Sequence, residues 1–139
     1  RPSVATIANA MDVGDPSNFA RILDLYGRSL EAIRADISAA RYDDGQICRA
    51  IAETLERTGY LLDPHGACGY LALCEGLRED ETGVFLETAH PAKFRDRVEP
   101  VIGRSIEIPA RLAEFMRGKK LSVELPADFG AFRDFLMAK

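Results

Sequence analysis

Residues 84–94, VFLETAHPAKF, decide the expected fold. The apolar run 84–86 leads into Thr88, and Pro91 then stops the extended stretch before what looks like a helix start. A strand that ends in a hydroxyl just before a helix N-terminus is how open α/β sheets present polar groups to a ligand. The stretch therefore predicts a strand over 83–88, a helix over about 92–100, and a polar site between them.

Helical patterns occupy most of the remaining chain. Asp15 before Pro16 predicts a helix N-cap, and Ser29 predicts a second cap. Asp43 and Gln46 form a capping-box pattern for a helix that closes near residue 59. Further helices are expected at about 66–79, after residue 109 and from 126 onward. The last of these carries a stripe that is expected to be core, made of Phe129, Phe132, Phe135 and Leu136.

Short extended patterns lie between these helices. Strands are predicted at 37–42, at 83–88 and, by alternation, at 121–125, while residues 1–14 fit either a strand or an extended lead-in. The expected fold class is α/β, helix-rich with a few short, mainly parallel strands. Three or four strands are too few for a self-contained sheet, and the chain starts at Arg1 without a methionine. We therefore expect residues 1–139 to be part of a larger domain.

Composition excludes several function classes. The 139 residues carry a net charge of −4 with 18 basic and 22 acidic side chains, and no basic block predicts a nucleic-acid partner. No apolar run predicts a membrane span. Three cysteines lack CxxC spacing and are interpreted as reduced, buried thiols of a cytoplasmic protein without a metal site, namely Cys48, Cys68 and Cys74. No GxSxG, GxGxxG or GxxxxGK motif is present.

The polar residues near the decisive stretch have two interpretations each. His65 and His90 each adjoin a proline, and they either fix their own turns or line one pocket at the same end of a sheet. Lys93 either sharpens an anion site at a helix start or is an exposed lysine. Thr88 shares a predicted strand face with residues 84 and 86, which we expect to be buried. Its hydroxyl then needs either a backbone carbonyl or a ligand atom.

Three motifs together resemble threonine synthase. They are MDVGDPSNF at 11–19, TGYLLDPH at 58–65 with Gly69 beyond it, and TAHPAKF at 88–94. The resemblance implies an enzyme that uses pyridoxal 5′-phosphate (PLP), with the tryptophan-synthase-β-like fold, fold type II of the PLP enzymes. It implies conversion of O-phospho-L-homoserine and water into L-threonine and phosphate.

The resemblance also implies roles for single residues. Thr88 would hydrogen-bond the pyridine nitrogen of the cofactor, and Asp63 and His65 would line the cofactor pocket, with His90 and Lys93 as further candidates. No catalytic residue is assigned. The family's Schiff-base lysine and glycine-rich phosphate loop lie N-terminal of these motifs and are absent from this sequence. The chain is therefore expected to be the C-terminal part of such an enzyme, inactive by itself and without covalently bound cofactor.

Three positions depart from the family pattern. Gly66 stands where threonine is more usual, Cys68 where a small aliphatic residue is usual, and Glu87 where a small residue is usual. Glu87 is expected to face away from Thr88 and to leave the cofactor contact intact. The alternative is a non-catalytic, threonine-synthase-like interaction or regulatory module. Another enzyme of the same fold, such as a dehydratase or phospholyase, fits the motifs less well. We also expect either self-association or partial disorder before residue 16.

Overall fold

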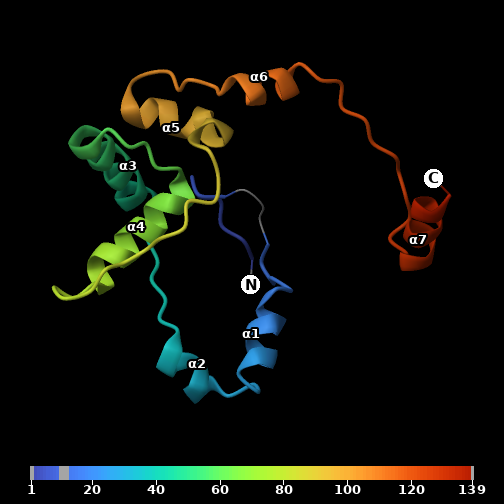
Figure 1. Cartoon of the computed structure of the whole chain (residues 1–139), viewed down its shortest axis with the longest axis horizontal. Helices are drawn as coiled ribbons and strands as arrows, with labels where there is room; N and C mark the ends of the chain where they lie inside the picture. The colour runs from blue at the N-terminus through green and yellow to red at the C-terminus, as the bar shows by residue number, and fades with distance from the viewer. Residues whose placement is uncertain (1, 10–12, 139) are drawn as a thin grey trace. The chain divides into compact units, whose positions relative to one another are not determined.

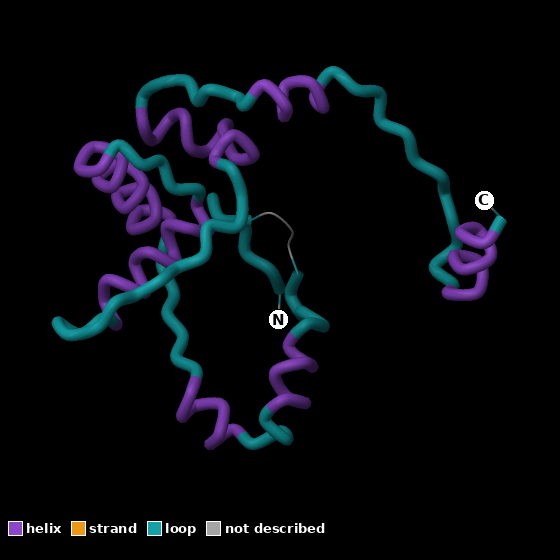
Figure 2. The backbone as a smooth tube through the Cα atoms, viewed as in Figure 1, coloured by secondary structure: helices purple, strands orange, loops and turns teal. Residues whose placement is uncertain are grey.

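The regular elements of the chain are helices. The computed structural model describes residues 2–9 and 13–138 (Figures 1 and 2). The elements are α1 (Phe19–Leu25), α2 (Leu30–Asp36), α3 (Asp44–Thr58), α4 (Pro64–Gly76), the 3₁₀ turn η1 (Pro91–Phe94), α5 (Arg95–Ile102), α6 (Ala110–Met116) and α7 (Phe129–Met137). The chain divides into two compact units, Arg1–Glu107 and Ile108–Lys139. No helix in the described ranges is both long and apolar enough to cross a membrane.

The first unit has one hydrophobic core, built where α3 packs against α4 and α5 (Figure 1). Ile51, Leu62 and Val98 are fully buried there. The other buried members of this core are Ile47, Ala50, Ala67 and Phe94. The core therefore holds both the start of α4 and the turn η1 in place, which are the two segments that carry the sequence motifs.

Helix α3 begins and ends as its sequence predicts. The Asp43 carboxylate accepts a hydrogen bond from the Gln46 backbone N–H at 2.8 Å, and the Gln46 side chain accepts one from the Asp43 N–H at 2.9 Å. This reciprocal pair confirms the capping box. Gly59 then closes the helix in the left-handed conformation, with φ +76°. The predicted Ser29 cap of α2 is also confirmed, since the Ser29 hydroxyl accepts from Ala32 N–H.

The expected parallel strands are wrong: within the described residues the chain forms no strand. Residues 37–42, 83–88 and 121–125 are extended but unpaired (Figure 2). A helix makes its hydrogen bonds within the segment, whereas a strand needs a neighbour from elsewhere in the chain. These segments have the composition of strands and lack that neighbour here, so the α/β class is replaced by an all-helical arrangement with extended connections.

Several helix details also differ from expectation. Helix α1 has Asn18 rather than Asp15 at its N-cap, and Asn18 makes no side-chain cap bond. Helix α4 starts earlier than predicted, at Pro64. The first motif begins at Met11 and Asp12, which lie outside the described residues. In the second unit α6 and α7 bury none of their described residues. The expected core stripe of α7 is therefore wrong for this chain, since Phe129 is 78% exposed.

Candidate functional site

Among the described residues, the most buried polar side chain lies at the start of α4. Asp63 is completely buried and caps the helix, and Pro64 occupies its first turn. The Asp63 Oδ1 atom accepts from the His65 backbone N–H at 2.8 Å and lies 3.0 Å from His65 Nδ1. Pro64 has no N–H to leave unsatisfied, so the sequence Asp-Pro-His suits a helix start. The Asp63 carboxylate thus fixes the backbone and the imidazole of His65 together.

The segment 83–94 contacts this helix start. The Asp63 backbone N–H donates to Glu87 Oε1 at 2.8 Å. The His65 and Phe94 rings lie with centroids 5.1 Å apart, and Lys93 Nζ lies 5.4 Å from the Phe94 centroid. Motifs 58–65 and 88–94 therefore form one structural unit, with Phe94 buried between them.

Thr88 lies on the outer side of this unit. Burial alternates along this segment, but the buried face is not the expected one. Residues 85, 87 and 89 are half-buried, while Val84 and Leu86 are 83% and 78% exposed. Thr88 shares the face of Val84 and Leu86, as predicted, yet that face is exposed rather than buried. Among the described residues, neither a backbone carbonyl nor a side chain makes a hydrogen bond with the Thr88 hydroxyl.

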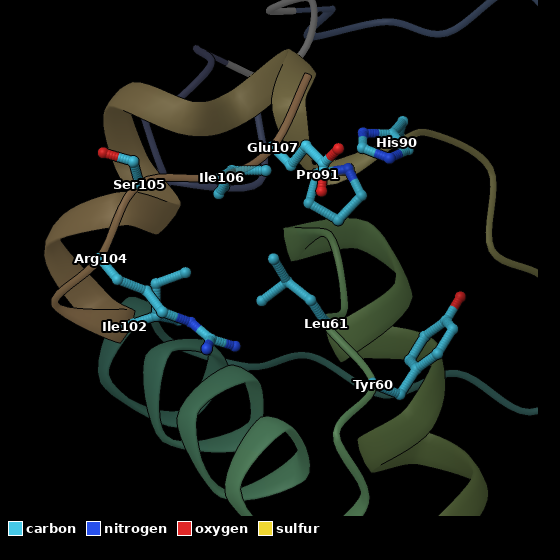
Figure 3. A pocket seen from close by; sticks show the side chains of 9 residues that line it. All are labelled: Tyr60, Leu61, His90, Pro91, Ile102, Arg104, Ser105, Ile106 and Glu107. Atoms are coloured by element: carbon cyan, nitrogen blue, oxygen red, sulfur yellow. The ribbon is translucent and has the colours of Figure 1, made fainter. Parts of the chain in front are cut away.

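His90 lines a hollow of about 510 Å³ near the motifs. In Figure 3 Leu61 points into this hollow, with His90 and Pro91 on one side and Arg104 on the other. The imidazole is also tied to its own turn, because His90 Nδ1 accepts from the Ala92 backbone N–H at 3.1 Å. That acceptor role leaves the ring proton on Nε2.

The other predicted pocket residues do not share this hollow. Lys93 lines a separate hollow of about 240 Å³, together with Ile7 and Asn9 from the N-terminal segment. Asp63 and His65 line neither of the two. The hypothesis that both histidines line one pocket is therefore not supported by the arrangement. The turn-fixing interpretation holds for His90, while His65 is fixed by a carboxylate rather than by backbone.

Two groups near Asp63, the Glu87 carboxyl and the Cys68 thiol, have raised pKa values. Desolvation raises the pKa of Glu87, and the neighbouring Asp63 side chain raises it further, while the Asp63 backbone N–H and His65 act in the opposite direction. Burial, and then the charge of Asp63, raise the pKa of the Cys68 thiol. The three cysteines are unpaired, but their expected burial is wrong, since Cys48 and Cys68 are half-buried and Cys74 is exposed. The described residues contain no cluster of side chains suited to a metal ion.

Comparison with known proteins identifies the family. Residues 66–136 match the family described as threonine synthase, C-terminal. The chain belongs to the threonine synthase family. It is 41% identical to the threonine synthase of Escherichia coli K12 over 96% of its own length, and 41% identical to that of Serratia marcescens over 97%. It spans 31% of the length of each of these relatives.

Solved threonine synthases share the arrangement of the chain. The crystal structure of the Escherichia coli threonine synthase aligns with a TM-score of 0.74 at 39% identity, covering 99% of this chain and 32% of that one. The PLP-bound threonine synthase of Brucella melitensis aligns with a TM-score of 0.76 at 29% identity, covering 99% and 35%. The resemblance of the three sequence motifs to threonine synthase is thereby confirmed.

Sequence reasoning missed two members of the site. Glu87 was expected on the opposite face from Thr88, which the structure confirms, but neither Glu87 nor Phe94 was given a contact. The structure places the Glu87 carboxyl against the start of α4 and the Phe94 ring against His65. A signal for the first was available, because the resemblance gave both Gly66 and Glu87 as departures, and a glycine can leave room for a larger side chain. No comparable signal marked Phe94.

Proposed function

We propose that this chain is the C-terminal part of a PLP-dependent threonine synthase, a lyase that converts O-phospho-L-homoserine and water into L-threonine and phosphate. The match of residues 66–136 to the C-terminal threonine synthase family carries the proposal. Because the chain spans 31% of its relatives, we expect the isolated chain to be inactive. The three unpaired thiols suit a cytoplasmic enzyme of threonine biosynthesis.

Thr88 is the residue we assign to the cofactor. Its hydroxyl is exposed at the end of the extended segment and has no partner among the described residues, so it can donate to a pyridine nitrogen. When bound, PLP supplies an electron sink for the substrate carbon. A hydroxyl is a neutral partner and leaves the ring nitrogen without the full proton that an aspartate partner would favour.

The remaining residues of the site orient and support Thr88. Asp63 holds His65 through its carboxylate, and His65 packs against Phe94 at the end of the Thr88 motif. His90 keeps its turn through the Ala92 N–H and lines the 510 Å³ hollow. Lys93 carries a positive charge over the Phe94 ring. We assign none of these four a proton-transfer step.

The proposal is tested on the full-length protein that contains this chain, by measuring phosphate release from O-phospho-L-homoserine. Replacing the hydroxyl in Thr88→Val is expected to lower kcat/KM about 10-fold, as for the loss of one hydrogen bond worth about 1.4 kcal/mol. Thr88→Ser keeps the hydroxyl and should retain most of the activity, and Thr82→Val in the exposed loop is the matched control. A full-length protein that binds no PLP and releases no phosphate would support a non-catalytic interaction or regulatory module instead.

A further inference from the structure

Two side chains attach the extended segment 83–88 to α4. Phe85 packs edge-on against Tyr70, with ring centroids 5.8 Å apart. Glu87, two residues later, accepts the Asp63 backbone N–H through Oε1. Both residues are half-buried, whereas Thr88 is exposed. Because successive side chains of an extended chain point to opposite sides, the inward placement of Glu87 sets the outward placement of Thr88.

Gly66 makes room for the Glu87 carboxyl. A Cβ atom at position 66 would collide with Oε1, Oε2 and Cδ of Glu87. The φ angle of Gly66 is not positive, so conformational freedom is not the reason for glycine here. Since the collision involves the end of a flexible side chain, a larger residue at 66 would displace the Glu87 carboxyl rather than break the helix. Gly66 and Glu87 are thus a matched pair.

The Glu87 and Asp63 carboxyls each keep one unsatisfied oxygen. Asp63 Oδ2 and Glu87 Oε2 are buried, and no described residue donates a hydrogen bond to either. Asp63 Oδ1 already accepts from His65. A buried acceptor without a partner is costly, and two like charges in contact are more so. The Asp63 side chain lies within hydrogen-bonding reach of the Glu87 carboxyl. One proton held between the two carboxyls satisfies both oxygens and removes one charge.

We propose that Glu87 is a positioning residue: its carboxyl shares one proton with Asp63, and this link attaches the extended segment to the start of α4 so that Thr88 presents its hydroxyl outward. The inference rests on the proposed function, in which that hydroxyl contacts the cofactor. Replacing the carboxyl by a methyl group releases the segment, while a carboxamide keeps the link.

The link depends on pH because it contains one proton. The groups that face it are Asp63 and His65 at the start of α4, with Cys68 one turn further along facing Asp63. From η1, Phe94 contacts His65 and carries the Lys93 amine over its ring. Burial and Asp63 raise the pKa of Glu87 above its ordinary value of 4.5. The link is therefore complete below that value, and it is lost as the pH rises through the raised pKa.

The first test uses thermal unfolding of the full-length protein without cofactor. Glu87→Ala is expected to lower the midpoint by about 2–4 °C at acid pH. In Glu87→Gln the carboxamide oxygen accepts from the Asp63 N–H and its NH₂ group donates to Asp63 Oδ2 at every pH. The wild type loses its link as the pH rises, so the midpoint of Glu87→Gln relative to wild type should rise with pH. Glu79→Gln, on the exposed loop after α4, is the matched control and should show no such trend. A Glu87→Gln difference that stays constant with pH would overturn the shared proton.

A double-mutant cycle tests the pairing with Gly66. Gly66→Ala should lower the midpoint of the wild type, because the new methyl group displaces the Glu87 carboxyl. In the Glu87→Ala background the same change should cost little, so the two effects are not additive. Equal costs of Gly66→Ala in both backgrounds would overturn the matched pair.

Positioning of Thr88 is read from the cofactor. In the holoenzyme, Glu87→Ala is expected to weaken PLP binding about 10-fold, because one hydrogen bond of the link is lost. The same variant should change the pH dependence of the visible PLP absorption. Glu87→Gln should restore both the affinity and the pH dependence. An absorption profile of Glu87→Ala identical to wild type would overturn the positioning role. Failure of the proposed function looks different, because the unsubstituted full-length protein would then bind no PLP.

Discussion

The imidazole of His65 and the ring of Phe94 lie with centroids 5.1 Å apart and planes tilted by 52°. This contact joins the first turn of α4 to the last residue of η1, which are 29 positions apart in the sequence. His65 is in turn held by the buried Asp63 carboxylate at 3.0 Å. One aromatic contact thereby connects the two motifs that carry the threonine synthase resemblance.

Shortening Phe94 should therefore destabilise the protein strongly. Phe94 is 5% exposed and belongs to the core of the first unit. Phe94→Ala in the full-length protein is expected to lower the free energy of unfolding by about 3–5 kcal/mol, the usual cost of emptying a buried aromatic site. Phe94→Leu retains most of the apolar volume and should cost clearly less. Urea denaturation measures both, and equal losses for the two variants would contradict a packing role for the ring.

The capping box of α3 gives a second prediction. Asp43→Ala removes the acceptor of the Gln46 N–H and should lower the free energy of unfolding by about 1 kcal/mol. Glu53→Ala, on the exposed face of the same helix, should change it by less than about 0.5 kcal/mol. Denaturation of the two variants side by side separates the cap from a general loss of negative charge. A loss for Glu53→Ala as large as that for Asp43→Ala would count against the cap.

Features set by local interactions could be predicted from the sequence. The Asp43–Gln46 box and the Ser29 cap depend on groups within three residues of one another, so the residue types at that spacing suffice. The inward residues of α3, Ile47 and Ile51, followed from helical periodicity in the same way. The resemblance of the motifs then supplied the family.

Features that depend on distant partners could not be predicted. The run 84–86 has strand composition, but a strand forms only where another segment supplies hydrogen bonds. The aromatic stripe of α7 has core composition, yet Phe132 remains 49% exposed because no described element covers it. Periodicity reports which residues share a face, not what that face contacts. Thr88 and Leu86 illustrate this point, since the face was correct and its burial was not.

In the candidate site, too, contacts between sequence neighbours could be predicted and contacts between distant segments could not. Asp63 and His65 were assigned to one pocket by the family resemblance, and the structure joins them within hydrogen-bond distance. Their meeting with Phe94 and Glu87 involves segments more than 20 residues away, and no spacing rule covers it. The role of Thr88 in cofactor binding stays a prediction that the Thr88→Val and Thr88→Ser pair tests.

Two glycines of the helix ends should respond in opposite directions. Gly59 closes α3 with φ +76°, where a side chain is strained, so Gly59→Ala should cost about 1 kcal/mol of unfolding free energy. Gly76, the last residue of α4, has open space around its Cα and no positive φ. Gly76→Ala should therefore be neutral or stabilise by up to about 1 kcal/mol. Thermal unfolding compares the two, and a stabilised Gly59→Ala variant would contradict the left-handed cap.

Tyr42 provides the prediction at high pH. Its hydroxyl donates to Glu75 Oε2 at 2.8 Å, and desolvation, then this hydrogen bond, raise its pKa from 10.0 to about 12. A raised folded pKa means that the contact stabilises the protein fully below pH 10 and is lost as the pH rises through about 12. Subtracting the ultraviolet titration curve of the Tyr42→Phe variant from that of the wild type isolates the ionisation of this phenol. Glu75→Gln removes the charge that opposes ionisation and should move the same transition downward, toward pH 10. An unchanged transition in Glu75→Gln would assign the shift to desolvation alone.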